Sequence, residues 1–454
     1  MTSTIKVDTI SENTSANGVA VDGVTLKDGA VGAAGTATSV AGVPLFTADS
    51  SIYIGQDVSG TDDTAQYNVA IGFTTLDAIT TGDSNVAIGY NAMTANTTGG
   101  SNISIGKSAL GTNTTGSTNI AIGLDALLNP DTESNNLGIG NAALGGSIAG
   151  GEYNVAIGNY SLDALTSGDN NTAVGYNAGT ALTTGAENTF FGYQAGVAHT
   201  TGTRVTAIGR SAYYRGDGEN DNTAMGYVAL GGNLSGGEFN VAIGNYSLEA
   251  LTSGDYNTSI GYQSGTAVTT GSESVYVGFQ AGANVTTGYK NVIIGSEAGL
   301  AGSPSGNLTT ENHQLCLGNN TLTNAFIKVD WTVTSDKRDK ADIEPLTMGL
   351  DFVNKLNPVS YRWDMRSDYE NQTPDGTHKK AKLSGGLLAQ DVEILEREYG
   401  YKVEDETSIL TTVNSDGNYG LTYSKFVPIL IKAVQELSAT VTTLQQEIKV
   451  LKGE

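Results

Sequence analysis

The segment Asn85-Val86-Ala87-Ile88-Gly89 sets the architecture of this 454-residue chain, because variants of it return down more than half of the sequence. In an extended strand, Val86 and Ile88 share one face and Ala87 occupies the other, so we predict a short strand that is at least half buried. Glycine at the strand end permits a positive φ, and the asparagine amide can bond neighbouring backbone groups. Both residue types therefore favour corners where the chain turns.

The copies of this segment are regularly spaced. Successive strand-end glycines follow a 17-residue period that is interrupted by two 18-residue steps. Asparagine stands four places before the glycine in twelve of the fifteen copies, and Ser51, Val205 and Ser274 replace it in the others. A longer, 86-residue period separates the closely similar copies that end at positions 72, 158 and 244, which indicates duplication of five-coil blocks. The fifteen glycines are Gly55, Gly72, Gly89, Gly106, Gly123, Gly140, Gly158, Gly175, Gly192, Gly209, Gly226, Gly244, Gly261, Gly278 and Gly295.

A second turn signal, Thr-Thr-Gly, precedes several copies, as at residues 97–99 and 286–288. Each 17-residue unit is therefore expected to form one coil with two or three short strands, stacked on the equivalent strands of the next coil. We predict a mainly β fold: a β-solenoid, or β-roll, of 17-residue repeats over residues 49–300. A small α+β domain that ends in a coiled-coil helix is expected to follow it.

The composition excludes several other classes of protein. The 60 glycines do not recur at every third position and only 7 prolines are present, which excludes a collagen triple helix, and the regular Val and Ile positions exclude disorder. A net charge of −24 makes nucleic acid and anionic membrane surfaces unfavourable partners. No apolar run is long enough for a secretion signal or membrane insertion, and we expect neither. The single cysteine, Cys316, is expected to be a buried apolar residue, and no pattern predicts a cofactor or a metal site.

A 17-residue coil encloses only a thin interior of Val, Ile and Ala. Burial of a second apolar face against two sister chains would complete it, so we expect a homotrimer. Repeats such as NVAIG, NTAVG and NTSIG resemble the head repeats of trimeric autotransporter adhesins over roughly residues 50–300. This resemblance implies a left-handed β-roll, with a period longer than is usual in those heads.

Residues 1–48 precede the repeats and contain STIKVDTI and the near-repeat GVAVDGVTLKDG at positions 18–29. They resemble the beginnings of structural proteins from marine and cyanobacterial tailed phages. The resemblance implies attachment to other virion tail or baseplate proteins through this segment. A poorly ordered N-terminal tail is the alternative.

The composition changes near Trp331, where Lys, Arg and Pro return and the glycine period stops. We treat residues 301–333 as a connector and residues 334–454 as a separate domain. Four segments of this domain occur in the order typical of one family. They resemble the endosialidase-type intramolecular chaperones, self-cleaving serine peptidases at the ends of phage fibres and tailspikes. The segments are TSDKRDKADI at 334–343, VSYRW at 359–363, GGLLAQDV at 385–392 and YSKFVPIL at 423–430.

The resemblance implies that Ser335 is a nucleophile with Lys340 as its base, and that the bond between Thr334 and Ser335 is cut. By the same resemblance Asp336 and His378 are supporting residues. A serine hydroxyl needs a base to become nucleophilic, and a lysine serves if burial lowers its pKa, although acidic neighbours oppose that shift. Without the family, the same stretch is a solvated loop in which Ser335 caps a helix.

Apolar residues near the end of the chain follow one another at alternating steps of four and three, which predicts a coiled coil over about residues 424–452. Val and Ile at one core position with Leu at the other favour two strands. We expect three, because the shaft and the resemblance both imply a trimer. A single amphipathic helix packed on its own domain is the alternative. The seam residues are Leu430, Val434, Leu437, Val441, Leu444, Ile448 and Leu451.

These observations predict a tail fibre of a virion, made in the host cytoplasm, that attaches to a host surface receptor. Exposed Tyr, Asn and Thr on a repeat surface suit a glycan receptor without specifying a sugar. The C-terminal domain would promote trimerisation and then release itself, which is serine peptidase activity in cis with no external substrate.

Two alternative functions are considered. A tailspike enzyme that degrades host glycans needs a pair of carboxylates in a cleft. The acids Asp163 and Glu249 are equivalent positions of the 86-residue period, as are Asp169 and Asp255, and such repetition favours turn and capping roles. A bacterial trimeric adhesin would need a secretion signal and an anchor, and neither is expected here.

Overall fold

The computed structural model describes residues 19–21, 24–26, 38–40, 43–48, 51–55, 61–322, 324–328, 332–414 and 417–453. The chain divides into two compact units, one formed by Met1–Ser296 with Thr309–Leu315 and the other by Glu297–Leu308 with Cys316–Glu454. None of the helices within the described ranges combines the length and hydropathy of a bilayer span. Most of the segment predicted for virion attachment, residues 1–48, lies outside the described residues.

Short antiparallel strands precede the solenoid. Strand β1 (Val19–Val21) pairs with β2 (Val24–Leu26), and β3 (Thr38–Val40) pairs with β4 (Val43–Ala48). Strand β4 also pairs with β5 (Ser51–Ile54), which is the first strand of the repeat ladder.

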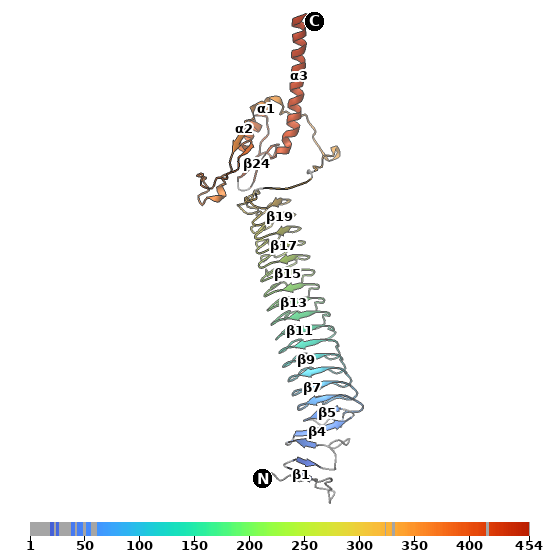
Figure 1. Cartoon of the computed structure of the whole chain (residues 1–454). Helices are drawn as coiled ribbons and strands as arrows, with labels where there is room; N and C mark the ends of the chain where they lie inside the picture. Colours follow the sequence, from blue (N-terminus) through green and yellow to red (C-terminus); the bar gives the residue numbers. More distant parts are fainter. Residues whose placement is uncertain are drawn as a thin grey trace. The chain divides into compact units, whose positions relative to one another are not determined.

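From β5 to β19 each strand pairs in parallel with the strand of the next coil, and Figure 1 shows them stacked in chain order. The register keeps equivalent residues opposite each other, as Ala70 lies opposite Ala87. The predicted β-solenoid of 17-residue repeats is confirmed. The strands are β6 (Val69–Ile71), β7 (Val86–Ile88), β8 (Ile103–Ile105), β9 (Ile120–Ile122), β10 (Leu137–Ile139), β11 (Val155–Ile157), β12 (Thr172–Val174), β13 (Thr189–Phe191), β14 (Thr206–Ile208), β15 (Thr223–Met225), β16 (Val241–Ile243), β17 (Thr258–Ile260), β18 (Val275–Val277), β19 (Val292–Ile294) and β20 (Leu315–Leu317).

Each coil contains one strand, and the expectation of two or three is wrong. After the strand-end glycine, left-handed residues recur, such as Thr74 at a φ of 54° and Leu76 at 53°. These residues turn the chain and interrupt extended structure. The rest of the coil therefore meets the next coil through separate backbone hydrogen bonds, as where the Leu76 N–H donates to the Ala92 carbonyl at 3.2 Å.

The strand residues alternate between two faces as predicted, but the expectation that the strand Val and Ile form the interior together with Ala is wrong. Ala87 is fully buried, whereas Val86 and Ile88 point outward and stay partly exposed. The glycine that follows is needed for two reasons. Gly89 has a φ of +136°, and a Cβ there would lie 2.5 Å from the carbonyl oxygen of Gly106 in the next coil.

The recurring asparagines form a buried, hydrogen-bonded column. The Oδ1 atom of Asn171 accepts a hydrogen bond from the backbone N–H of Asn188 at 3.0 Å, and its Nδ2 donates to the carbonyl of Gly185 at 2.9 Å. The side chain thereby satisfies backbone groups that the narrow interior hides from water. The positive φ belongs to the preceding residue, Asn170 at 58°, so the column asparagine bonds the corner and does not turn it.

Three coils carry an aromatic side chain, Tyr53, Phe190 or Tyr276, where many others carry an inward Ala. Phe190 is fully buried and lies beside Gly179 and Gly196, which occupy positions that hold Leu or Met in many other coils. A Cβ on Gly196 would lie 2.5 Å from Cδ1 of the Phe190 ring. Tyr276 is accommodated in the same way beside Gly282. Loss of one large side chain thus makes room for another, so the interior stays close-packed.

The second unit is a small α+β fold with its own apolar core. Its strands form two antiparallel pairs, β21 with β22 and β23 with β24. The core residues are Met348, Phe352, Val392, Leu395, Leu410, Phe426 and Ile429. The elements are η1 (Lys337–Asp339), α1 (Leu350–Lys355), β21 (Val359–Tyr361), η2 (Arg366–Asp368), β22 (Ser384–Gly386), α2 (Ala389–Glu398), β23 (Thr411–Val413), β24 (Tyr419–Leu421), η3 (Tyr423–Lys425) and α3 (Phe426–Lys452).

Two carboxylates fasten the elements of this unit. Glu396 on α2 is fully buried and accepts hydrogen bonds from the backbone N–H groups of Leu410 at 2.8 Å and Thr411 at 3.0 Å. Glu436 on α3 accepts from the N–H of Leu350 at 2.7 Å, at the start of α1. The first turns of α3 are therefore held firmly against the domain.

Candidate functional site

Ser335 and Lys340 meet across a single turn. The short helix η1 lies between them, and the side chain of Asp336 caps it by accepting a hydrogen bond from the Arg338 N–H at 2.9 Å. The turn returns the chain so that the Lys340 ammonium group donates to Oγ of Ser335 at 2.6 Å. The predicted nucleophile and base therefore lie in direct contact, and we call them the Ser–Lys dyad.

Asp336 stabilises this turn electrostatically. Its carboxylate forms an ion pair with the Arg338 guanidinium at 2.6 Å, and these hydrogen bonds hold the pKa of Asp336 below its usual value. The carboxylate is thus directed at Arg338. The helix cap that a purely structural interpretation gives to Ser335 belongs to Asp336.

The dyad is open to water in the single chain. Thr334, Ser335 and Lys340 are all exposed. A lysine in water keeps its proton at neutral pH, and desolvation is the ordinary way to make it a base. The geometry of the dyad is present in one chain, but the low-polarity surroundings that the chemistry needs are not.

His378 lies apart from the dyad. Its backbone N–H donates to the Tyr369 hydroxyl at 3.0 Å, and the two rings meet edge to face at 4.9 Å. Within the described residues, no hydrogen bond or ring contact joins His378 to Ser335 or Lys340. A supporting role for His378 therefore stays a prediction.

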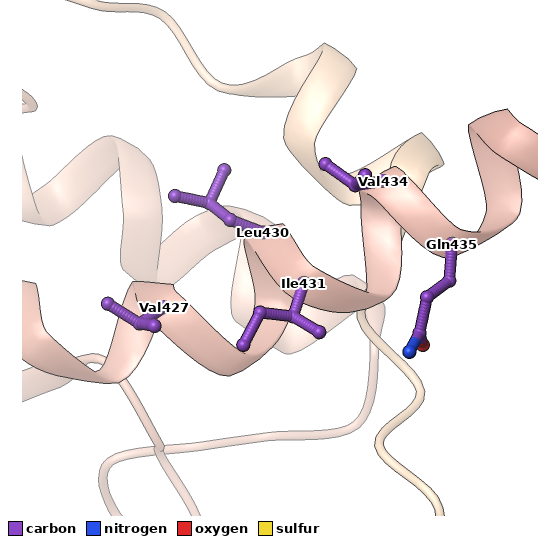
Figure 2. Close-up of a pocket in the computed structure, with 5 residues that line it drawn as sticks. All are labelled: Val427, Leu430, Ile431, Val434 and Gln435. Carbon is purple, nitrogen blue, oxygen red and sulfur yellow. The ribbon is translucent and has the colours of Figure 1, made fainter.

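Helix α3 uses two faces. Phe426, Ile429 and Ala433 are buried against the domain core. The heptad seam faces outward, with the side chains of Leu430 through Leu451 between 44% and 85% exposed. Figure 2 shows the start of this seam, where an apolar groove is lined by Val427, Leu430, Ile431, Val434 and Gln435. Packing on its own domain therefore accounts for the first turns of α3, but no part of the chain that the structure describes covers the seam.

The repeated carboxylates of the shaft hold turns. Asp169 accepts a hydrogen bond from the Glu152 N–H at 2.8 Å, and Asp255 accepts from the Glu238 N–H at the same distance. This repetition confirms the capping role expected of these two residues. Asp163 is partly buried, and desolvation raises its pKa.

A row of rings runs along the shaft just after the strand-end glycines. The rings of Tyr176 and Tyr193 are stacked with their centroids 5.5 Å apart, and those of Tyr262 and Phe279 are stacked with their centroids 5.7 Å apart. Aligning the repeats on their glycines would have revealed this row, which counting exposed tyrosines did not. We call it the aromatic column. Its members are Tyr160, Tyr176, Tyr193, Arg210, Tyr227, Tyr246, Tyr262 and Phe279.

Residues 335–400 match a family model described as the chaperone of endosialidase. The matched stretch begins at the serine of the dyad and includes both Lys340 and His378. No curated protein and no solved structure matches the chain.

Proposed function

We propose that this chain is a virion tail fibre that attaches to a host surface, and that its C-terminal unit aligns three copies before cutting itself away. The carrying observation is the contact between Ser335 and Lys340 at the first residues of the stretch similar to endosialidase chaperones. The exposed seam of α3 gives further support, since it offers a surface for sister chains.

The proposed cleavage uses the dyad in three steps. Neutral Lys340 takes the proton of the Ser335 hydroxyl, and Oγ attacks the carbonyl carbon of Thr334. The C–N bond to Ser335 breaks, and the Lys340 ammonium returns the proton to the departing nitrogen. Water then hydrolyses the ester between Thr334 and Ser335, which leaves a carboxylate on one fragment and a free amine on the other.

Assembly is proposed to switch this chemistry on. In one chain the dyad is exposed to water, so the low-polarity surroundings that the step needs are missing. Sister chains gathered by α3 would cover the dyad and exclude water. Cleavage would then follow trimer formation and could not precede it.

An aligning domain answers a folding difficulty of the shaft. Its coils are nearly identical, so a sister chain displaced by one coil makes almost the same contacts, and non-local pairing of this kind is slow. Three chains joined at one end would begin in the correct register. Removal of the guide after folding would trap the product kinetically.

The proposal is tested on denaturing gels of heated recombinant protein. Wild type is expected to give a shaft fragment ending at Thr334 and a fragment of residues 335–454. Ser335→Ala and Lys340→Met should remain full length, because each removes one partner of the dyad. Lys337→Met removes a neighbouring exposed lysine and should be cleaved like wild type. Cleavage of Ser335→Ala, or its loss in Lys337→Met, would contradict the assigned roles.

A further inference from the structure

The aromatic column is continuous over eight successive coils. Every neighbouring pair is in contact, either ring to ring at 5.2–6.0 Å or through Arg210, whose guanidinium lies 5.6 Å from the rings of both Tyr193 and Tyr227. The rings of Tyr176, Tyr193 and Tyr262 each remain about half exposed. Large apolar surfaces of this kind on a soluble protein usually mark a contact with something else.

The residues beside the strand-end glycines of the column carry few charges. Residues 49–300 contain 21 acidic and five basic residues. From Gly158 to Gly278, however, no acidic residue stands within four places of a strand-end glycine. Arg210 is one of the five basic residues, is exposed, and makes no ion pair among the described residues. The column therefore offers an exposed cation that has no carboxylate within four places of it in sequence, although the Glu249 carboxylate acts electrostatically on Tyr246 at another coil of the column.

This combination fits a carbohydrate that carries carboxylates. The C–H groups on the face of a sugar ring pack well on the electron-rich face of a tyrosine. An arginine guanidinium binds a carboxylate through two parallel hydrogen bonds, which a neutral sugar cannot offer. Coils repeat at about 4.8 Å, so rings recur along the shaft in the way that sugar units recur along a polysaccharide.

We propose that the aromatic column binds an acidic polysaccharide laid along the shaft, with its sugar rings on the tyrosine faces and a carboxylate paired to Arg210. The inference rests on the proposed host attachment and names the ligand class and the binding surface for it.

A sister chain is the competing occupant of this surface. Burial of Arg210 between shafts would leave a charge that needs a counter-charge to offset its desolvation. The outward Val and Ile residues of the strands, such as Ile157 and Ile243, provide an apolar face without that cost. The column is therefore assigned to the ligand and the strand face to the sister chains.

Binding of the full-length protein to polygalacturonate tests the proposal, with neutral amylose and flexible polyglutamate as the comparison polymers. Wild type should bind polygalacturonate more tightly than either. Arg210→Gln should weaken binding at least about tenfold, the usual size of a lost charged hydrogen bond. Tyr193→Ala should weaken it about threefold to tenfold. Tyr256→Ala, which removes a ring that is 59% exposed outside the column, should leave it unchanged.

Three results would overturn the assignment. They are absence of polygalacturonate binding by wild type, equal binding of polyglutamate, and dissociation of the assembly by Tyr193→Ala, which would give the column to the sister chains. The first two leave host attachment intact if the same protein still trimerises and releases residues 335–454. Failure to trimerise would instead count against the proposed fibre.

Discussion

The shaft and the C-terminal unit differ in how far a single chain buries its own apolar and polar groups. In the shaft, buried groups such as Asn171 and Asn188 bond to the neighbouring coil of the same chain. In the C-terminal unit, the α3 seam and the Ser335–Lys340 pair are exposed. One coil is thus completed by the next coil, whereas the described residues of this chain leave the seam of α3 uncovered. The difference teaches that assembly should start at the C-terminal end.

The largest effect is expected from charges placed in the seam. Leu437→Asp with Leu444→Asp should abolish assembly, because two carboxylates would lie at the apolar core of a coiled coil. Size-exclusion chromatography with light scattering should give a trimer for wild type and single chains for the variant. Ser438→Asp adds a charge beside the seam and should remain trimeric. A wild-type dimer would support the two-stranded coil favoured by the Val and Leu pattern.

Within the shaft, the largest loss of stability is expected when one of the buried asparagines that recur in each coil is replaced. Asn171→Ala leaves the Asn188 N–H and the Gly185 carbonyl buried without their partner. Two such groups at about 1–3 kcal/mol each predict a loss of about 2–6 kcal/mol in the free energy of unfolding. Denaturant unfolding of the released shaft measures it, with the outward Thr172→Val as the control. A loss below about 1 kcal/mol would mean that water replaces the amide.

A smaller effect on stability is expected from substitutions at Phe190 and Gly196, where a large side chain fills the space that a glycine leaves free. Gly196→Leu alone should lower stability by about 1–3 kcal/mol, since its φ is +60° and the Phe190 ring fills the space. Adding Phe190→Ala converts the coil toward the Leu and Ala pattern of its neighbours and should recover part of the loss. Strictly additive losses in the double variant would refute the compensation.

The smallest effect depends on pH and on one histidine. His199 is fully buried between Phe190 and Tyr213, and desolvation lowers its pKa. Below about pH 6.5 the unfolded chain therefore binds more protons than the native shaft, so stability falls as pH falls and is unaffected above that value. The loss approaches about 1.4 kcal/mol per pH unit. Between pH 7.5 and 5, the melting temperature of His199→Leu should fall less steeply than that of wild type. Parallel plots of melting temperature against pH for the two proteins would contradict this.

Much of the shaft could be predicted from the sequence, because its 17-residue period repeats a strand and a glycine whose physical roles are local. The number of strands per coil could not. It depends on side chains such as Leu76 that fill the interior from left-handed positions, and leucine gives no local sign of that conformation. The exchange between Phe190 and Gly196 was also missed, since it joins residues that meet only after the coil closes.

For the candidate site, Ser335 and Lys340 are in contact because a single short turn separates them, and their roles as nucleophile and base stay predictions. Asp336 bonds Arg338, a partner that the sequence analysis did not predict, and its supporting role stays a prediction. His378 was assigned through the resemblance, and its position in a loop depends on tertiary packing that spacing does not encode. To find the aromatic column, one has to know which residues of successive coils lie next to each other. Aligning the repeats on their glycines gives this register.

The most direct test of the account is whether cleavage requires assembly. Purified wild type and the Leu437→Asp, Leu444→Asp variant are compared by the rate at which residues 335–454 appear on denaturing gels, with oligomeric state measured on the same samples. The account predicts complete cleavage in the trimer and almost none in single chains, although both keep Ser335 and Lys340. Equal cleavage rates in trimers and single chains would contradict it.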